Sequence, residues 1–135
     1  MNVLKLTRSN YKIDSNRIYL FGHSMGGGGS MHLAMKYPNI WAAIAVVAPA
    51  IYGDRSRLES GKNIPAYVVQ GDRDRLVSVR ETRQWVEQMK ILKMKHKYVE
   101  VKNGGHVFVA WQHFDGIFKF FADNPKQDSK KAKKD

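Results

Sequence analysis

The sequence contains no cysteine and no long hydrophobic run, and it carries about half as many acidic residues (12) as basic ones (23). Without cysteine, a disulfide scaffold, a thiolate nucleophile and Cys-based metal sites are excluded. No window approaches the roughly 20 apolar residues that a membrane span needs. The first ten residues lack the apolar core of a signal peptide, because Lys5 and Arg8 interrupt them. We therefore expect no membrane span and a cytoplasmic location.

The shortage of acidic residues leaves a formal net charge of +11, which admits nucleic acid or an anionic membrane surface as a partner. The positive charge is spread along the chain and does not form a recognisable binding module, so nucleic acid is not the expected partner. The one cluster of lysines lies at the carboxyl end. Residues 123–135 are predicted to form a basic, disordered tail, and residues 1–122 a single partial domain.

Apolar runs alternate with helical patterns along the 135 residues, which is typical of parallel strands joined by crossover helices. The sequence thus predicts an α/β fold with about four mostly parallel strands and flanking helices. The last strand, which carries Glu100, is expected at an edge. In the last helix, Trp111, Phe114, Phe118 and Phe121 are expected to face the core. Residues 49–63 are expected to be irregular. The expected strands are 17–21, 42–48, 66–70 and 97–101, and the expected helices are 27–37, 79–92 and 107–121.

The segment Gly22-His23-Ser24-Met25-Gly26 is a G-x-S-x-G motif. It lies between an expected strand and an expected helix, which is the context of a nucleophile elbow. The turn is so tight that side chains at positions 22 and 26 are expected to collide with neighbouring backbone, which accounts for both glycines. The Ser24 hydroxyl is then expected at the positive end of the helix, where backbone N–H groups face a developing anion.

A nucleophilic serine needs a base, and the base needs a carboxylate to orient it. Both residue types occur in loops after later strands: carboxylates within residues 71–77 and His106 at the end of residues 103–106. The carboxyl ends of parallel strands open on the same side of a sheet, where ligands bind. The chain order Ser, Asp, His is the one found in α/β-hydrolases.

These motifs resemble the carboxyl-terminal half of an α/β-hydrolase, in the carboxylesterase and prolyl-oligopeptidase-like branch. The resemblance covers about residues 10–122. It implies that Ser24 is the nucleophile, Asp74 the triad acid, His106 the base, and the backbone N–H of Met25 an oxyanion donor. The matching segments are 14–29, 36–38, 41–44, 64–65, 71–77 and 104–106.

Asp72 competes with Asp74 for the role of the acid. In the matching branch the acid lies three residues after a glycine and three before a valine. Gly71 and Val77 are at these distances from Asp74, which favours Asp74. His23 is interpreted as a packing or orienting residue, and Arg73 and Arg75 as solvated loop charges. No metal or organic cofactor is expected, because the remaining histidines have no metal-ligand spacing: His32, His96 and His113.

The resemblance also implies a departure from the family pattern before the nucleophile strand, where this chain has room for only one helix, about residues 2–10. A second oxyanion donor often comes from a His-Gly-Gly loop in that region, and none precedes Ser24. The strand 17–21 then becomes a sheet edge with unpaired backbone groups. We expect a homo-oligomer or a strand exchange to cover this edge; the alternative is that the chain is a fragment of a longer protein.

The function predicted from these residues is serine carboxylic ester hydrolysis on short acyl esters through an acyl-enzyme, with a small ester as the substrate. Two alternatives remain open. One is a catalytically weak or inactive hydrolase fragment that acts as a binding or assembly module, and the other is a serine peptidase.

Overall fold

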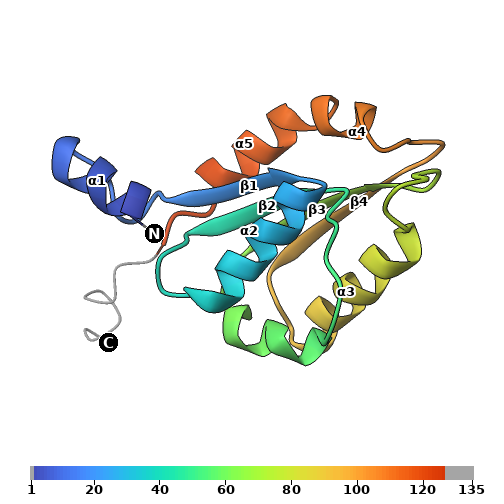
Figure 1. Cartoon of the computed structure of the whole chain (residues 1–135), viewed down its shortest axis with the longest axis horizontal. Helices are drawn as coiled ribbons and strands as arrows, with labels where there is room; N and C mark the ends of the chain where they lie inside the picture. The colour runs from blue at the N-terminus through green and yellow to red at the C-terminus, as the bar shows by residue number, and fades with distance from the viewer. Residues whose placement is uncertain (1, 127–135) are drawn as a thin grey trace.

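The computed structural model describes residues 2–126 and contains one four-stranded parallel sheet in the order β1-β2-β3-β4 (Figure 1). The predicted α/β class and the parallel arrangement are confirmed. Each strand starts and ends within two residues of its expected range. The strands are β1 (Tyr19–His23), β2 (Ala43–Val47), β3 (Ala66–Gly71) and β4 (His96–Val101).

Helices cover both faces of the sheet (Figure 1). On one face, even-numbered strand residues such as Ile44 and Val68 pack with Met31 of α2 and Trp85 of α3. On the other face, odd-numbered residues pack against α4 and α5. This division follows from the period-two alternation of strand side chains. The helices are α1 (Asn2–Asn10), α2 (Met25–Lys36), η1 (Arg55–Gly61, a 3₁₀ helix), α3 (Val79–Ile91), α4 (Phe108–Trp111) and α5 (Phe114–Ala122).

The two central strands are buried at every position, as their continuous apolar runs predict. The β1 strand is less buried than its sequence predicts, because it lies at one edge, and Phe21 is 44% exposed. The β4 strand forms the other edge, as expected from its charged residues. In the described part of the chain, no helix is both long and apolar enough to cross a membrane.

The single helix expected over 107–121 is wrong: Gln112 and His113 separate α4 from α5. The prediction that Trp111 and Phe118 face the core is also wrong, since they are 67% and 66% exposed. The break interrupts the helical period on which that prediction depended. The buried residues that pack against the sheet from these helices are Val109, Ala110, Ile117 and Phe121.

Two further segments are more ordered than the sequence predicts. Within the expected irregular loop, Asp54 caps η1 by accepting the N–H of Ser56, and Leu58 is buried. At the start of the expected tail, Asn124 is buried and the N–H of Lys126 donates to the Asn16 carbonyl at 2.9 Å. The remainder of the predicted tail, residues 127–135, lies outside the described residues.

Adjacent glycines of α2 provide a matched test of how this helix packs. A Cβ at Gly28 would overlap the carbonyl of Ala50, whereas a Cβ at Gly29 would meet open space. We expect Gly28→Ala to lower the free energy of unfolding by about 1 to 3 kcal/mol, because the helix must move. Gly29→Ala should raise it by about 0.5 to 1 kcal/mol through helix propensity. Urea unfolding of both variants checks this; equal effects would contradict the packing.

Candidate active site

Ser24 lies at a sharp turn between β1 and α2. Its φ and ψ are 55° and −120°, a left-handed conformation that is costly for a residue other than glycine. Both backbone groups of Ser24 are hydrogen-bonded. Its N–H donates to the Val47 carbonyl, and its carbonyl accepts the N–H groups of Gly28 and Ala50. This strained turn between strand and helix presents the Ser24 side chain at the end of the sheet.

The two glycines of the motif do not share one role. A Cβ at Gly22 would overlap the carbonyl of Gly26, as the tight turn predicts. A Cβ at Gly26 would meet nothing within 4 Å, so the expected collision at that position is wrong. Gly26 is the second residue of α2, where a Cβ would point into open space. Its carbonyl is nevertheless the atom that makes Gly22 necessary.

Two loops at the ends of β3 and β4 come into direct contact. A Cβ at Gly71 would overlap the Gly104 carbonyl, and that carbonyl accepts the N–H of Arg73 at 3.0 Å. This close approach brings the segment that carries Asp74 beside the segment that carries His106. Glycine at position 71 is therefore required by the contact between the loops.

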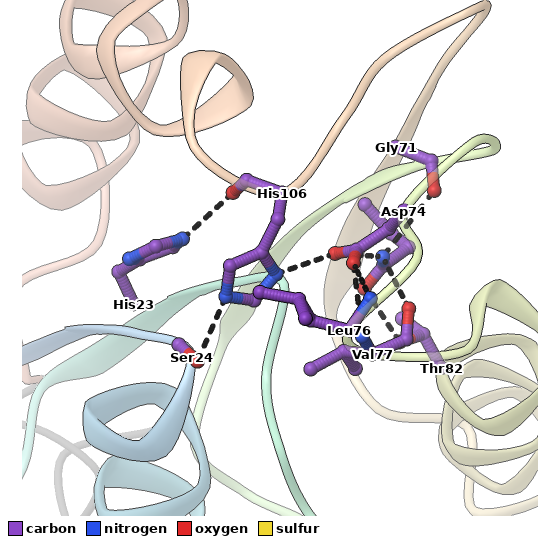
Figure 2. Close-up of polar contacts among 9 residues, drawn as sticks. His23, Ser24, Gly71, Asp74, Leu76, Val77, Thr82 and His106 are labelled. Carbon is purple, nitrogen blue, oxygen red and sulfur yellow. Dashed lines mark hydrogen bonds and ion pairs between the residues drawn. The ribbon is translucent and has the colours of Figure 1, made fainter.

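The imidazole of His106 lies between Ser24 and Asp74 (Figure 2). Its Nε2 is 2.9 Å from Ser24 Oγ, and its Nδ1 is 2.7 Å from Asp74 Oδ2. The side chain of His106 is 11% exposed and that of Asp74 is fully buried. With the proton on Nδ1, the ring donates to Asp74 and leaves Nε2 free to accept the hydroxyl proton of Ser24. The structure thus joins the three predicted residues in one hydrogen-bonded line.

Asp74 is surrounded by donors. Its Oδ1 accepts the backbone N–H groups of Leu76 and Val77 at 2.8 and 2.9 Å, and its Oδ2 accepts from His106 and from Gln70. Burial raises the pKa of this carboxyl. Hydrogen bonds outweigh that effect, with Val77 and His106 contributing most, and hold the pKa below its ordinary 3.8. The carboxylate therefore stays ionised at neutral pH.

Gln70 and Thr82 were missed by sequence reasoning. Both are buried, and the Gln70 side chain contacts Asp74 while Thr82 contacts Gln70. The signal that could have revealed Gln70 is a lone amide side chain inside the apolar run of β3.

His23 was expected to be a packing or orienting residue. Its Nε2 lies 2.8 Å from the His106 carbonyl oxygen, and the centroids of the two imidazole rings are 4.8 Å apart.

The competing candidates lie outside this line. Asp72 has a buried Oδ1 with no hydrogen-bond partner, whereas Asp74 lies 2.7 Å from His106 Nδ1, so the geometry favours Asp74. The side chains of Arg73 and Arg75 are exposed loop charges. Among residues 2–126, no group of three or more His, Asp or Glu residues is placed to hold a metal ion.

Comparison with known proteins identifies the family. A family model described as PETase, PET hydrolase-like, matches residues 2–123. This chain belongs to that family. Cutinase 1 of Thermobifida cellulosilytica is 35% identical over 68 residues, which are 50% of this chain and 24% of the cutinase. S-formylglutathione hydrolase of Rattus norvegicus is 40% identical over 45 residues, 33% of this chain and 16% of that enzyme.

Solved structures give the same fold. A thermostable esterase superimposes with a TM-score of 0.84 at 26% identity, covering 93% of this chain and 35% of the esterase. An S-formylglutathione hydrolase from Agrobacterium tumefaciens superimposes with a TM-score of 0.72 at 20% identity, covering 93% of this chain and 55% of that enzyme. The α/β-hydrolase resemblance is therefore confirmed. This PET hydrolase-like chain matches only about a quarter of the cutinase's length.

The lowered pKa of Asp74 predicts a pH-dependent stability difference between the wild type and Asp74→Asn. At neutral pH the variant should be about 1 to 3 kcal/mol less stable, because an amide NH₂ replaces one acceptor oxygen among donors. Because the folded-state pKa lies below 3.8, the advantage is present above that value and is lost as the pH falls through the lowered pKa. Urea unfolding across this range measures it; a pH-independent difference would contradict the assignment.

Proposed function

We propose that this chain is a serine carboxylic ester hydrolase in which Ser24 is the nucleophile, His106 the base and Asp74 the acid. The observation that carries the proposal is the hydrogen-bonded line from Ser24 Oγ through the imidazole to the buried carboxylate. Relatives named cutinase, S-formylglutathione hydrolase and esterase support ester hydrolysis as the reaction class.

The first half of the reaction acylates the serine. His106 Nε2 takes the proton of the Ser24 hydroxyl while Oγ attacks the ester carbonyl carbon, which forms a tetrahedral oxyanion. The imidazole then carries a positive charge, and the Asp74 carboxylate 2.7 Å from Nδ1 stabilises it. Collapse of the oxyanion expels the alcohol, which receives the proton from Nε2. An ester between the acyl group and Ser24 remains.

The second half repeats these steps with water. His106 Nε2 takes a proton from water as the water oxygen attacks the acyl carbon, which forms a second tetrahedral oxyanion. The oxyanion collapses and releases the acid, and Nε2 returns the proton to Ser24 Oγ. Met25, next to the nucleophile, is exposed, as are Val107 and Phe108 after the base. An open surface of this kind favours short acyl groups, because a short group can bind without a tunnel.

The oxyanion donor that we assign is the backbone N–H of Met25. Met25 is the first residue of α2, so its N–H has no intrahelical acceptor and lies at the positive end of the helix. No His-Gly-Gly motif precedes Ser24 in the sequence. Losing one donor costs about 3 kcal/mol of transition-state stabilisation in enzymes that use two. We therefore expect slow turnover for this chain on its own.

Ser24→Ala should reduce the hydrolysis of p-nitrophenyl acetate by at least about 10³-fold, since the nucleophile and the acyl-enzyme are lost. Ser9→Ala is the control, because Ser9 is an exposed serine of α1. Initial rates with purified proteins provide the measurement. Equal rates in the wild type and Ser24→Ala would reject the proposal and favour a binding module. Faster cleavage of a peptide than of the ester would favour a serine peptidase.

A second proposal concerns assembly of this chain with further copies of itself. It is supported by the edge position of β1, by the absence of buried residues in the neighbouring α1, and by an exposed aromatic group beside the edge. Phe21 and Trp111 each contact Phe114 edge-on, with ring centroids 5.6 and 5.5 Å apart. An exposed apolar edge of this kind pairs readily with another chain.

Light scattering is expected to give at least twice the 15.5 kDa chain mass at high protein concentration. Phe21→Lys should shift the protein toward the monomer, because a charge then replaces the apolar contact at the edge. Ile91→Lys is the matched control, since Ile91 is an exposed apolar residue of α3, away from β1. A monomeric wild type at every concentration, or equal effects of the two substitutions, would contradict this proposal.

A further inference from the structure

Gln70 is a fully buried amide side chain within a strand whose other residues are apolar or glycine. Burying an amide without partners costs several kcal/mol, so its position calls for hydrogen bonds. The Nε2 group donates to Asp74 Oδ2 at 3.0 Å, to the Val77 carbonyl at 3.2 Å and to the Gly71 carbonyl at 3.3 Å. The Oε1 atom accepts the hydroxyl of Thr82 at 2.8 Å.

This set of partners allows only one orientation of the amide. A carboxylate and two carbonyls can only accept hydrogen bonds, so the NH₂ end of Gln70 must face Asp74. The carbonyl end then faces Thr82, which donates its hydroxyl proton. Thr82 is itself buried in the first turns of α3. The amide therefore ties the loop after β3 to the start of the following helix.

The contact of Gln70 with Asp74 is made at the oxygen that faces the catalytic base. Oδ1 is fixed by two backbone N–H groups. Oδ2 is held by side chains only, His106 at 2.7 Å and Gln70 at 3.0 Å. Without the amide, the carboxylate could rotate about its fixed Oδ1 and move Oδ2 away from the imidazole. Gln70 blocks that rotation without touching the substrate side of Ser24.

We propose that Gln70, oriented by Thr82, is a positioning residue that holds Oδ2 of Asp74 against Nδ1 of His106. This inference rests on the proposed function, because it assigns a role within the same triad. The orientation of His106 during both proton transfers then depends on a side chain that is three hydrogen bonds away from the nucleophile. Residues that orient the ligands of metal sites typically contribute about 10- to 100-fold to activity, and we expect an effect of the same order for Gln70.

The first test compares Gln70→Met with Gln88→Met, the same change on the half-buried face of α3. Gln70→Met should lower kcat by about 10- to 100-fold and leave KM within about twofold, because the lost contact is remote from the substrate. Gln88→Met should behave as the wild type. A kcat for Gln70→Met equal to that of the control, or a loss confined to KM, would overturn the proposal.

A second pair of variants keeps the proposal testable if Gln70→Met folds poorly. Thr82→Ser keeps the hydroxyl and loses a methyl group, whereas Thr82→Val keeps the shape and loses the hydroxyl. If the hydrogen bond to Gln70 matters, Thr82→Ser retains the higher kcat. If the site needs packing alone, Thr82→Val retains it, and the positioning role is wrong.

A readout without turnover separates this proposal from the proposed function. The proton between His106 Nδ1 and Asp74 should give a low-field NMR signal in the wild type, with or without esterase activity. Gln70→Met should broaden or abolish that signal through faster exchange, and Gln88→Met should retain it. An unchanged signal in Gln70→Met contradicts positioning. If the wild type shows the signal but no hydrolysis, and Gln70→Met loses the signal, the positioning role is supported and only the proposed function is rejected.

Discussion

Three parallel strands that end at the same edge of the sheet are the constraint on which the site depends. The register places His23 opposite Val47, and Gly71 opposite Val101, so the loops that follow β1, β3 and β4 open at the same end of the sheet. The side chains of Ser24, Asp74 and His106 meet across this end of the sheet. The backbone bond from the Ser24 N–H to the Val47 carbonyl ties the elbow to the neighbouring strand. A shift of register in any of these strands would separate the three groups.

Local strain is held by this framework. The left-handed backbone of Ser24 costs about 1 to 3 kcal/mol, and three backbone hydrogen bonds together with the close packing of Gly28 against Ala50 keep it in place. Similarly, the fully buried charge of Asp74 is tolerated because its donors offset the loss of water. In both cases the surrounding structure, and not the residue itself, maintains the arrangement that acyl transfer would require.

The sequence was most informative about the order of the strands and the turn at Ser24. The alternation of apolar runs predicted the four strands, and the G-x-S-x-G motif predicted a sharp strand-to-helix turn at Ser24. The break at Gln112 and His113 was not predictable, because the aromatic spacing fits a continuous helix. Which face of α5 is buried is seen only in the structure, where Ile117 and Phe121 pack against the sheet. The Gln70 contact was missed for a related reason: its partners lie up to 12 residues away and meet only after folding.

Covalent labelling with a fluorophosphonate probe, read by mass spectrometry, tests the central claim most directly, because it reports an activated serine without requiring a known substrate. The account predicts that the wild type is labelled at Ser24 and at no other serine, and that His106→Ala loses this labelling because the base is missing. An unlabelled wild type, or labelling of Ser24 at the same rate in His106→Ala, would contradict it.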